Sequence, residues 1–433
     1  MADIAPFAGL RYNLPQVGGL QQVVAPPYDV ITPDEQAALY ERHPANVVRL
    51  ILGKELPGDD GQNRYTRAAA CLEEWLRDGV LLREKDPALY LCRMEYEDAE
   101  GAFRALTILY CQLRLEPLGA GGVLPHEATL SGPKEDRLRL LRATRTNLSG
   151  VFCLVSDPNA VLEQLCAERT ARPPLGSATD IWGVRHRLWV ETDPSIAAAA
   201  RAFLQEKPLF IADGHHRYET ALRYRDEVRA ANGNRPGPWD WTLVAIAALE
   251  SPGITVLPTH RVVREVAPAQ LNTFLERARD LFAVEPAGDL SELLACMRDE
   301  QAAGRHAFGV FHADEGFHLL RLTAPERADA LLDPVRAPAW RQLDVALLHG
   351  IIIEHLLGVS SEQAMQSGQI GYLKDAAQCV RQVEAGEFQA ALFLNPTPPE
   401  AVKEVALAGE KMPQKSTYFF PKLLSGLVMR PVY

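Results

Sequence analysis

A short stretch in the middle of the chain, residues 213–217, concentrates the side chains best suited to chemistry. It reads Asp213-Gly214-His215-His216-Arg217. The imidazoles and the guanidinium can donate hydrogen bonds to phosphate oxygens, and the aspartate can hold a magnesium ion or orient a histidine. The alternative is a solvated turn that caps a helix. We favour a phosphate-handling loop, because five consecutive polar or flexible residues stand in the turn.

The elements on either side of this loop are predicted to position it. Residues 208–211 form a short apolar run of the length of a buried strand, and the chain breaks at Asp213-Gly214. The apolar and long side chains that follow have the spacing of a helix face: Tyr218, Leu222, Arg225 and Val228. A strand, a glycine turn and a helix together point free backbone N–H groups at an anion. Neither the dinucleotide-binding fingerprint nor a P-loop occurs in the sequence.

Two further pairs of polar residues are candidates for the same chemistry. His126-Glu127 places a base beside a carboxylate just before a helical stretch at 134–145, although such a pair on its own is most often solvated. His260-Arg261 follows a short predicted strand, where an imidazole and a guanidinium either contribute to the site or form a structural turn. Both pairs are kept as candidates.

The candidates near the ends of the chain are weaker. Tyr28 lies in Pro26-Pro27-Tyr28-Asp29, for which we expect a rigid turn, and Arg11 is weaker still. Lys415 and Ser416 lie in a polar and aromatic loop at 412–422, which is either a ligand contact or an interface strand.

The histidines and cysteines elsewhere do not predict a metal site. His349 and His355 are six apart in a predicted helix, so they face different sides and are interpreted as structural. The seven cysteines are scattered singly, which is typical of reduced thiols in the cytosol.

The order of predicted elements indicates an α/β fold of the mixed α+β kind. We expect an N-terminal α/β region at 1–120, a phosphate-binding core at 121–262 and a C-terminal α/β domain at 263–433. The first predicted helix begins at a capping box, Thr32 to Glu35. Further helices are predicted at 65–76, 134–145, 196–205, 269–281, 290–301, 343–357, 375–385 and 400–408. At 23–31 we expect a short strand that runs into a proline-fixed extended segment. Two hairpins are predicted, one with strands at 88–96 and 103–115 and one at 306–322, and single strands at 187–191, 241–249, 369–373 and 390–394.

Length, composition and charge exclude several function classes. A chain of 433 residues has room for two or three domains. Its net charge of −11 argues against nucleic acid as a partner, because phosphate neutralisation supplies most of that affinity. No apolar run reaches membrane-spanning length and the first residues lack the pattern of a signal peptide. We therefore expect a cytoplasmic protein that binds neither nucleic acid nor a membrane.

Three motifs, at 25–31, 211–221 and 415–419, resemble a large bacterial family catalogued as domain of unknown function 1015. The resemblance runs from end to end. The central loop also resembles the phosphate-binding loop of the ParB/sulfiredoxin superfamily, which implies such a core within 121–262. Sulfiredoxins have a cysteine where His215 stands here, so their sulfinic-acid chemistry is not implied. The ParB proteins add a basic DNA-binding domain, for which this acidic chain offers no candidate.

Within that superfamily, the loop is most similar to the free serine kinases, which phosphorylate L-serine with ADP or ATP. In those enzymes a His-Glu pair precedes a helix and a strand then delivers Asp-Gly-His-His-Arg. His126-Glu127 and residues 213–217 occur here in the same order, with a longer segment between them than in the small kinases.

The resemblance implies a small-molecule phosphotransferase that uses ATP or ADP with Mg²⁺, and L-serine is the acceptor it suggests. Glu127 would be the base and Asp213 the magnesium ligand, while residues 214–217 would bind phosphate, with His216 also acting in catalysis. Two alternatives remain open: a nucleotide-binding regulatory module without fast turnover, and a phosphatase or phosphodiesterase. The flanking regions would shape substrate access or form a homodimer. The second tier of site candidates contains His126, His260, Arg261, Lys415, Ser416 and Tyr28.

Overall fold

The computed structural model describes residues 2–59, 61–98, 100–119, 121–127, 131–360, 367–413 and 415–433, with the side chains of 131–133 left out. The chain divides into two compact units, and each is described by itself. Unit 1 contains Met1–Pro125, Thr129–Thr255 and Pro421–Tyr433, and unit 2 contains His126–Ala128 and Val256–Phe420. These units do not follow the three regions expected from the sequence, because strands from 1–120 and from 121–262 pair in one sheet.

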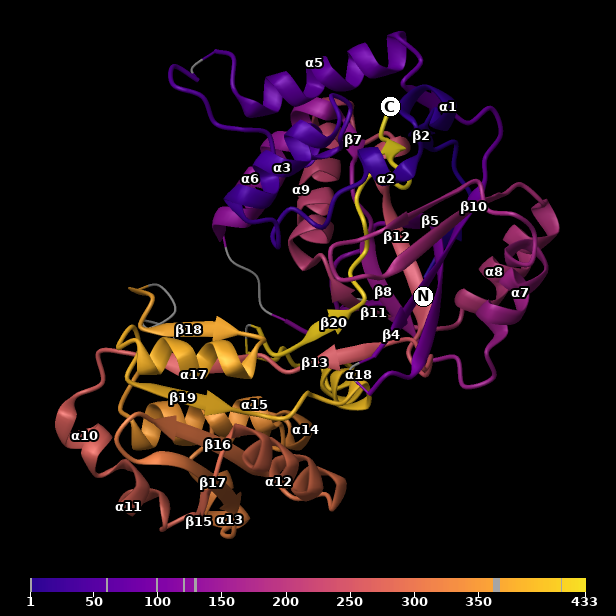
Figure 1. Ribbon diagram of the computed structural model, residues 1–433. Coiled ribbons are helices and arrows are strands. Elements are labelled where there is room, and N and C mark those ends of the chain that lie inside the picture. The colour runs from indigo at the N-terminus through magenta and orange to yellow at the C-terminus, as the bar shows by residue number, and fades with distance from the viewer. Residues whose placement is uncertain are drawn as a thin grey trace. The chain divides into compact units, whose positions relative to one another are not determined.

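Unit 1 is built on a mixed sheet that has nine strands within the described ranges (Figure 1). Its order is β6-β11-β8-β12-β5-β4-β10-β9, and β1 pairs with β5. The nine strands are β1 (Ile4–Ala5), β4 (Leu89–Glu97), β5 (Phe103–Arg114), β6 (Val123–Pro125), β8 (Val151–Val155), β9 (Gly176–Thr179), β10 (Arg185–Glu191), β11 (Leu209–Asp213) and β12 (Trp241–Ala248). Short strand pairs join β2 (Leu10–Tyr12) to β3 (Leu81–Arg83), and β7 (Thr146–Asn147) to β21 (Arg430–Pro431).

The long strands of this sheet agree with the sequence patterns. The predicted hairpin is confirmed, since residues 90–97 of β4 pair antiparallel with residues 103–110 of β5. The apolar run at 241–249 forms β12 in the middle of the sheet, between β5 and β8, with residues 242–247 buried. A strand that is covered on both faces has no polar alternation, which is why this run is continuously apolar.

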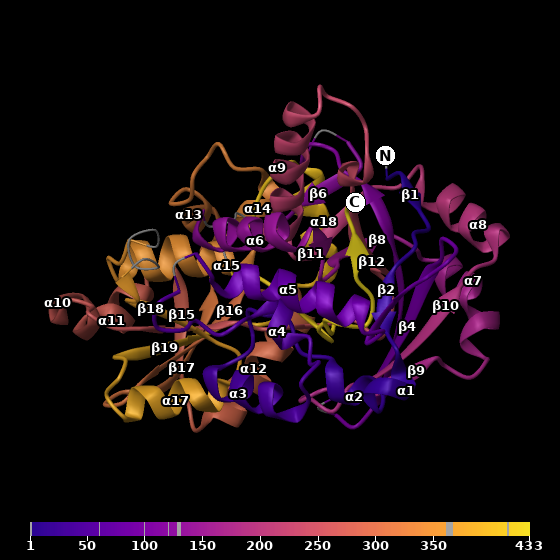
Figure 2. The ribbon, with the colours of Figure 1, turned by 90° about the horizontal axis from the view of Figure 1, so that it is seen from above.

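The helices of unit 1 begin where local capping chemistry is available. The predicted capping box is confirmed, because the Glu35 amide donates to Thr32 Oγ1 and the Glu35 carboxylate accepts from the Thr32 amide. Helices α6 (Ser131–Thr144) and α9 (His215–Ala231) pack against each other, as Figures 1 and 2 show from two directions. The helices are α1 (Leu14–Val17), α2 (Leu20–Val23), α3 (Pro33–Arg42), α4 (Val48–Ile51), α5 (Arg64–Arg77), α6 (Ser131–Thr144), α7 (Val161–Thr170), α8 (Pro194–Leu204) and α9 (His215–Ala231), with a short 3₁₀ turn η1 (Pro238–Asp240).

The strand predicted at 23–31 is wrong. Val23 ends α2, and the extended segment after it forms a single bridge, between Ala25 and Ser425. Pro26 and Pro27 carry no backbone N–H and cannot extend that bridge into a ladder. The turn expected at Tyr28 is present.

Unit 2 has its own sheet, with six strands among the residues described, in the order β15-β17-β16-β19-β14-β18. The predicted hairpin at 306–322 is confirmed as β16 and β17. The strands are β14 (His260–Val263), β15 (Phe282–Ala287), β16 (Ala307–His312), β17 (Gly316–Leu322), β18 (Ile370–Leu373) and β19 (Ala390–Phe393). A separate two-stranded pair joins β13 (Thr255–Leu257) and β20 (Tyr418–Phe420).

The helices of unit 2 differ from the sequence pattern in two places. The helix expected at 269–281 is broken at Thr273, whose hydroxyl donates to the Ala269 carbonyl and competes with the helix. The helix expected at 343–357 is mostly a π-helix, in which the Leu357 amide donates to the Ile352 carbonyl. The elements are α10 (Pro268–Asn272), α11 (Phe274–Ala278), α12 (Leu290–Ala302), α13 (Pro325–Asp329), α14 (Pro338–Arg341), α15 (Asp344–Leu347), the π-helix η2 (Leu348–Leu356), α17 (Ala376–Glu384) and α18 (Pro399–Leu407).

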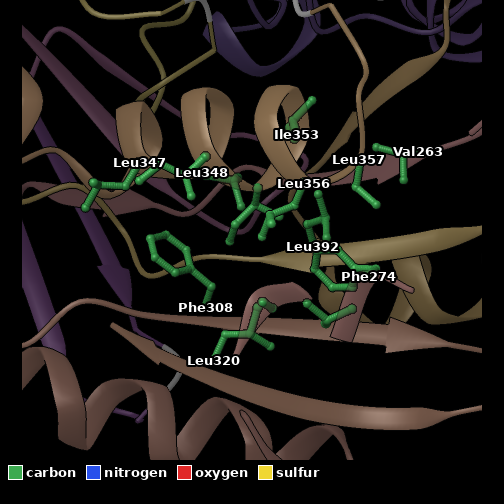
Figure 3. Packing of buried hydrophobic residues seen from close by; sticks show 14 of the residues in the cluster. Val263, Phe274, Phe308, Leu320, Leu347, Leu348, Ile353, Leu356, Leu357 and Leu392 are labelled. Atoms are coloured by element: carbon green, nitrogen blue, oxygen red, sulfur yellow. The ribbon is translucent and has the colours of Figure 1, made fainter. Parts of the chain in front are cut away.

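The π-helix covers one face of the unit 2 sheet. Figure 3 shows Leu348 and Leu356 on the side of the helix that faces Phe308 and Leu392 of the strands, and these four side chains are buried. The mixed α/β class predicted from the sequence is thus confirmed. In the described part of the chain, no helix combines the length and the apolar character that crossing a membrane requires.

Candidate functional site

The central loop lies in unit 1, at the point where β11 ends and α9 begins. Residues 209–211 are buried and pair with β6 on one side and β8 on the other, so the strand is fixed in the sheet. Gly214 then has a φ of 92°, in the left-handed region that favours glycine. Helix α9 starts at His215 and runs for 17 residues, with its N-terminus at the loop. The strand, turn and helix predicted from the sequence are therefore confirmed.

Asp213 ends the strand and faces two cations. The Lys422 ammonium lies 3.3 Å from its Oδ2, and an Arg217 guanidinium nitrogen lies 3.7 Å from the same oxygen. Burial alone would raise the pKa of this carboxyl, but Lys422 and Arg217 hold the pKa well below its usual range. Asp213 is therefore ionised at neutral pH.

Arg217 occupies the space directly above the loop backbone. A Cβ atom on Gly214 would lie 2.9 Å from the Arg217 guanidinium, so the left-handed conformation favours glycine here and any larger residue would also displace this side chain. The same guanidinium donates to the Gly150 carbonyl, in the loop before β8. Arg217 thus connects the start of α9 to the neighbouring strand.

Tyr28 is brought close to Arg217, although it lies almost 190 residues earlier in the chain. Both residues line a cavity of about 50 Å³ in unit 1. The guanidinium of Arg137, on α6, stacks 3.8 Å from the centre of the Tyr28 ring. The N-terminal motif therefore contributes to the surroundings of the central loop within unit 1.

His126 and Glu127 belong to unit 2, where Thr417 contacts both. The Thr417 hydroxyl lies 2.8 Å from Nε2 of the fully buried His126. The amide and hydroxyl of Thr417 each donate to Glu127 Oε1 at 3.4 Å. The Met412 amide also donates to the His126 carbonyl, at 2.7 Å. The segment around 412–417 therefore orients the His-Glu pair.

Arg261 is fully buried in unit 2 and is held by neutral groups. Its Nε donates to His349 Nε2 at 3.2 Å, and its other nitrogens donate to the carbonyls of Thr259 and Lys415. Burial lowers the pKa of Arg261 to about 10, and the charges of Tyr372 and Glu127 act in the opposite direction. Arg261 therefore fixes the backbone at Lys415.

The remaining second-tier residues of unit 2 have structural surroundings. The His260 ring packs edge-on against Phe393, and burial lowers the pKa of His260 to about 4. Lys415 has a φ of 58°, and Ser416 is buried with its hydroxyl donating to the Pro413 carbonyl. The structural role predicted for His349 agrees with its buried contact to Arg261.

The structure adds three residues that the sequence analysis did not select. Lys422 lies at the end of the loop predicted at 412–422, Arg137 in the helical stretch predicted at 134–145 and Thr417 in the motif at 415–419. Each contacts a residue far away in the sequence: Lys422 contacts Asp213 across 209 positions, Arg137 contacts Tyr28 across 109, and Thr417 contacts Glu127 across 290. No local pattern encodes contacts over such distances.

No group of three or more histidine, cysteine or carboxylate side chains gathers as a metal site in the described ranges. Asp213 is the predicted metal ligand, and no contact between described residues joins a second carboxylate to it.

The chain belongs to the family described as "Protein of unknown function (DUF1015)", whose model matches residues 4–346. None of the curated proteins compared with the sequence matches it.

Several solved structures are similar to it at low identity. One is a free serine kinase mutant in complex with AMP, 12% identical with a TM-score of 0.37 over 72% of this chain and 87% of that chain. A conserved hypothetical protein from Pyrococcus furiosus is 12% identical with a TM-score of 0.34, over 72% and 90% of the two chains. C-terminally truncated SbnI from Staphylococcus aureus is 11% identical with a TM-score of 0.35, over 72% and 84%. The likeness of residues 121–262 to the ParB/sulfiredoxin superfamily remains a prediction from the loop motif.

Proposed function

We propose that the protein is a small-molecule phosphotransferase that uses ATP or ADP and whose acceptor is a hydroxyl amino acid such as L-serine. The observation that carries the proposal is the Asp213 carboxylate, which Lys422 and Arg217 keep ionised. This carboxylate directly precedes the left-handed Gly214 and the long helix α9. Phosphoryl transfer asks mainly for positioning and for neutralisation of negative charge, and this loop supplies groups for both.

The loop would hold the transferring phosphoryl group. The N-terminus of α9 carries a partial positive charge, and its first amides follow Gly214 directly. His215 and His216 stand in the first turn, and Arg217 lies one residue further along, against the loop backbone. In the proposed reaction these groups bind and orient the phosphoryl oxygens.

A magnesium ion fits this donor set through Asp213. Magnesium commonly uses one or two protein carboxylates and completes its shell with substrate phosphates and water. Asp213 would be the protein ligand of the ion, and Lys422 and Arg217 keep its carboxylate in the ionised form that a metal requires. The ion would neutralise charge on the nucleotide phosphates.

Glu127 is the proposed general base. A serine hydroxyl must lose its proton as it attacks phosphorus, and a positioned carboxylate that accepts it typically contributes roughly 10²–10⁴-fold to the rate. Thr417 contacts Oε1 of Glu127 through two donors, which would hold the carboxylate in one orientation.

Phosphorus NMR of the purified protein with magnesium, ATP or ADP, and a panel of hydroxyl amino acids tests the proposal. We expect a phosphoserine signal in the wild type. Glu127→Gln should reduce its rate by roughly 10²–10⁴-fold, because a base is removed, and Asp213→Asn by roughly 10²–10³-fold, because charge stabilisation is lost.

Two exposed carboxylates serve as matched controls, Glu404→Gln on α18 and Asp226→Asn on α9, and both should leave the rate unchanged. Nucleotide that binds but stays intact would replace the proposal with the regulatory module. Inorganic phosphate released without an acceptor would replace it with the hydrolase. Full activity in both Glu127→Gln and Asp213→Asn would show that the assigned roles are wrong.

A further inference from the structure

The cavity between Tyr28 and Arg217 has a lining suited to an anion. It lies entirely in unit 1, and Arg137, Ser149 and Asn147 also line it. Two guanidinium groups, from α6 and α9, thus face one small space that also contains hydroxyl and amide groups. Guanidinium and hydroxyl groups together are the usual partners of carboxylate and phosphate oxygens.

Arg137 is held rigidly at the edge of this cavity. Its Nε donates to Asp136 at 2.7 Å, and its Nη1 donates to the Ile51 carbonyl at 2.9 Å. Asp136 in turn accepts from Tyr65 at 2.8 Å and from Arg64 at 2.6 Å. A guanidinium fixed by this many contacts loses little conformational entropy when it binds a ligand, which favours affinity.

Tyr28 presents a hydroxyl that is suited to donate to the same anion. Among the residues described, no hydrogen bond satisfies it, while its ring is fixed under Arg137. Burial raises the pKa of Tyr28, and the charges of Arg137 and Arg217 lower it. The phenol is therefore protonated at neutral pH and lies within the field of both arginines.

A second phenol near Arg217 points to the same conclusion. The hydroxyl of Tyr110, on β5, is buried and has no hydrogen-bond partner among the described residues. The charge of Arg217 acts on its pKa, which burial raises well above the usual value. A buried phenol without a partner is costly, so the Tyr110 hydroxyl favours ordered water or a ligand group beside Arg217.

The size of the cavity limits what it can hold. At about 50 Å³ it has room for a few water molecules or one small group, since one water needs roughly 10–15 Å³ measured in this way. A nucleoside is far larger than this, whereas a phosphoryl or a carboxylate group fits.

We propose that Tyr28, Arg137 and Arg217 form an oxyanion subsite that binds one charged group of a substrate, either a nucleotide phosphoryl group or the carboxylate of the acceptor. The inference rests on the proposed function for the identity of these substrates. It gives the N-terminal motif around Tyr28 a binding role, where the sequence alone indicated a rigid turn.

Calorimetric titration of the full-length protein with inorganic phosphate, ADP and L-serine tests the subsite without any turnover. Tyr28→Phe keeps the ring under Arg137 and removes the hydroxyl, so we expect at least one of these affinities to fall about tenfold, the loss of one hydrogen bond to a charged group. Arg137→Lys should weaken the same ligand. Tyr40→Phe is the matched control, because the Arg49 guanidinium stacks on the Tyr40 ring in the same way, 4.3 Å from its centre, and Tyr40 does not line the cavity.

The pattern of losses identifies the bound group. If the variant binds phosphate and ADP more weakly but serine as tightly as the wild type, the subsite binds the phosphoryl group. If only serine binding is weakened, the subsite binds the carboxylate of the acceptor. Unchanged affinities in Tyr28→Phe, or a wild type that binds none of the three probes, would overturn the subsite. If the wild type binds phosphate at this subsite but makes no phosphoserine, the subsite stands and the phosphotransferase proposal fails. If phosphoserine forms and Tyr28→Phe has wild-type KM values, the phosphotransferase proposal stands and the subsite proposal fails.

Discussion

The two units stabilise a buried charge in opposite ways. In unit 1, the Asp213 carboxylate faces the cations of Lys422 and Arg217. In unit 2, Arg261 is fully buried, and no carboxylate in the described part of the chain forms an ion pair with it. Two carbonyls and a neutral histidine accept its hydrogen bonds instead.

This difference separates a site suited to ligands from a structural brace. Asp213 keeps a side chain that is 20% exposed, and its ionised form is favoured by its neighbours, so it can meet a ligand as an anion. Arg261 has no exposed surface, and its donors are directed at the backbone that carries Lys415. Perturbed charges alone would mark both places as functional candidates, and the surrounding contacts distinguish them.

The largest effect is expected on removing the brace. Arg261→Met should destabilise the protein by about 2–4 kcal/mol, because two carbonyls and His349 lose their donor in a place that water does not reach. Urea denaturation measures the change. Arg264→Met, at an exposed arginine stacked on Phe388, is the control. A stability equal to the wild type would mean that the cost of burying the guanidinium cancels its hydrogen bonds.

A smaller effect is expected at the anionic site. Asp213→Asn should cost about 2 kcal/mol at neutral pH, because Lys422 and Arg217 lose their counter-charge. The carboxyl has a lowered pKa in the folded protein, so its stabilisation is present above the ordinary aspartate pKa of about 3.9 and is lost as the pH falls below it. The difference between variant and wild type should therefore shrink below about pH 4, as followed by unfolding curves at several pH values. A difference independent of pH would argue against an ionised Asp213.

The glycine of the loop offers a matched pair of variants. Gly214 and Gly183 both have left-handed backbones, with φ of 92° and 81°, but a Cβ would meet Arg217 only at Gly214 and nothing within 4 Å at Gly183. Gly183→Ala should cost about 1–2 kcal/mol from conformation alone. Gly214→Ala should cost about 1 kcal/mol more, because the Arg217 guanidinium must move. Equal losses in the two unfolding free energies would show that this contact is unimportant.

The smallest effect at neutral pH is expected for the histidine that supports Arg261. Burial lowers the pKa of His349 to about 3 in the folded protein. As the pH falls below about 6.5, this histidine is protonated in the unfolded chain but not in the folded one, so the free energy of unfolding declines toward pH 3. His349→Gln retains an acceptor for Arg261 and should change stability at pH 7 by less than about 1 kcal/mol while flattening this decline. Melting temperatures between pH 7 and pH 4 measure the slope. His260, with a pKa of about 4, should leave a residual slope of the same sign.

Much of the fold follows from short-range patterns. The capping box at Thr32 and Glu35, the hairpin of β4 and β5 and the strand-to-helix turn at Gly214 each depend on residues close together in the chain. The failures also have local causes that periodicity does not show. The two prolines after Ala25 prevent a ladder, and Thr273 breaks a helix with its own hydroxyl. At 343–357 the apolar pattern indicates a helix but does not show that the amides bond five residues back instead of four.

The candidate site was predicted in part. The loop at 213–217 and Glu127 were identified by residue type, and Tyr28 was identified as a weak candidate. Lys422, Arg137 and Thr417 were missed because single lysines, arginines and threonines are common on surfaces and carry no signal until a partner is known. Arg261 was identified as a candidate for chemistry, and its contacts instead show a structural brace.

The sequence by itself determined what neighbours along the chain decide: the left-handed turn at Gly214, the helix that follows it, the family and the mixed α/β class. The tertiary structure decided which charges meet. It placed Lys422 beside Asp213 and Tyr28 in a cavity with Arg217. Turn conformations and caps depend on sterics and hydrogen bonds within a few residues, whereas these pairs form only when strands and helices from distant parts of the chain pack in one unit.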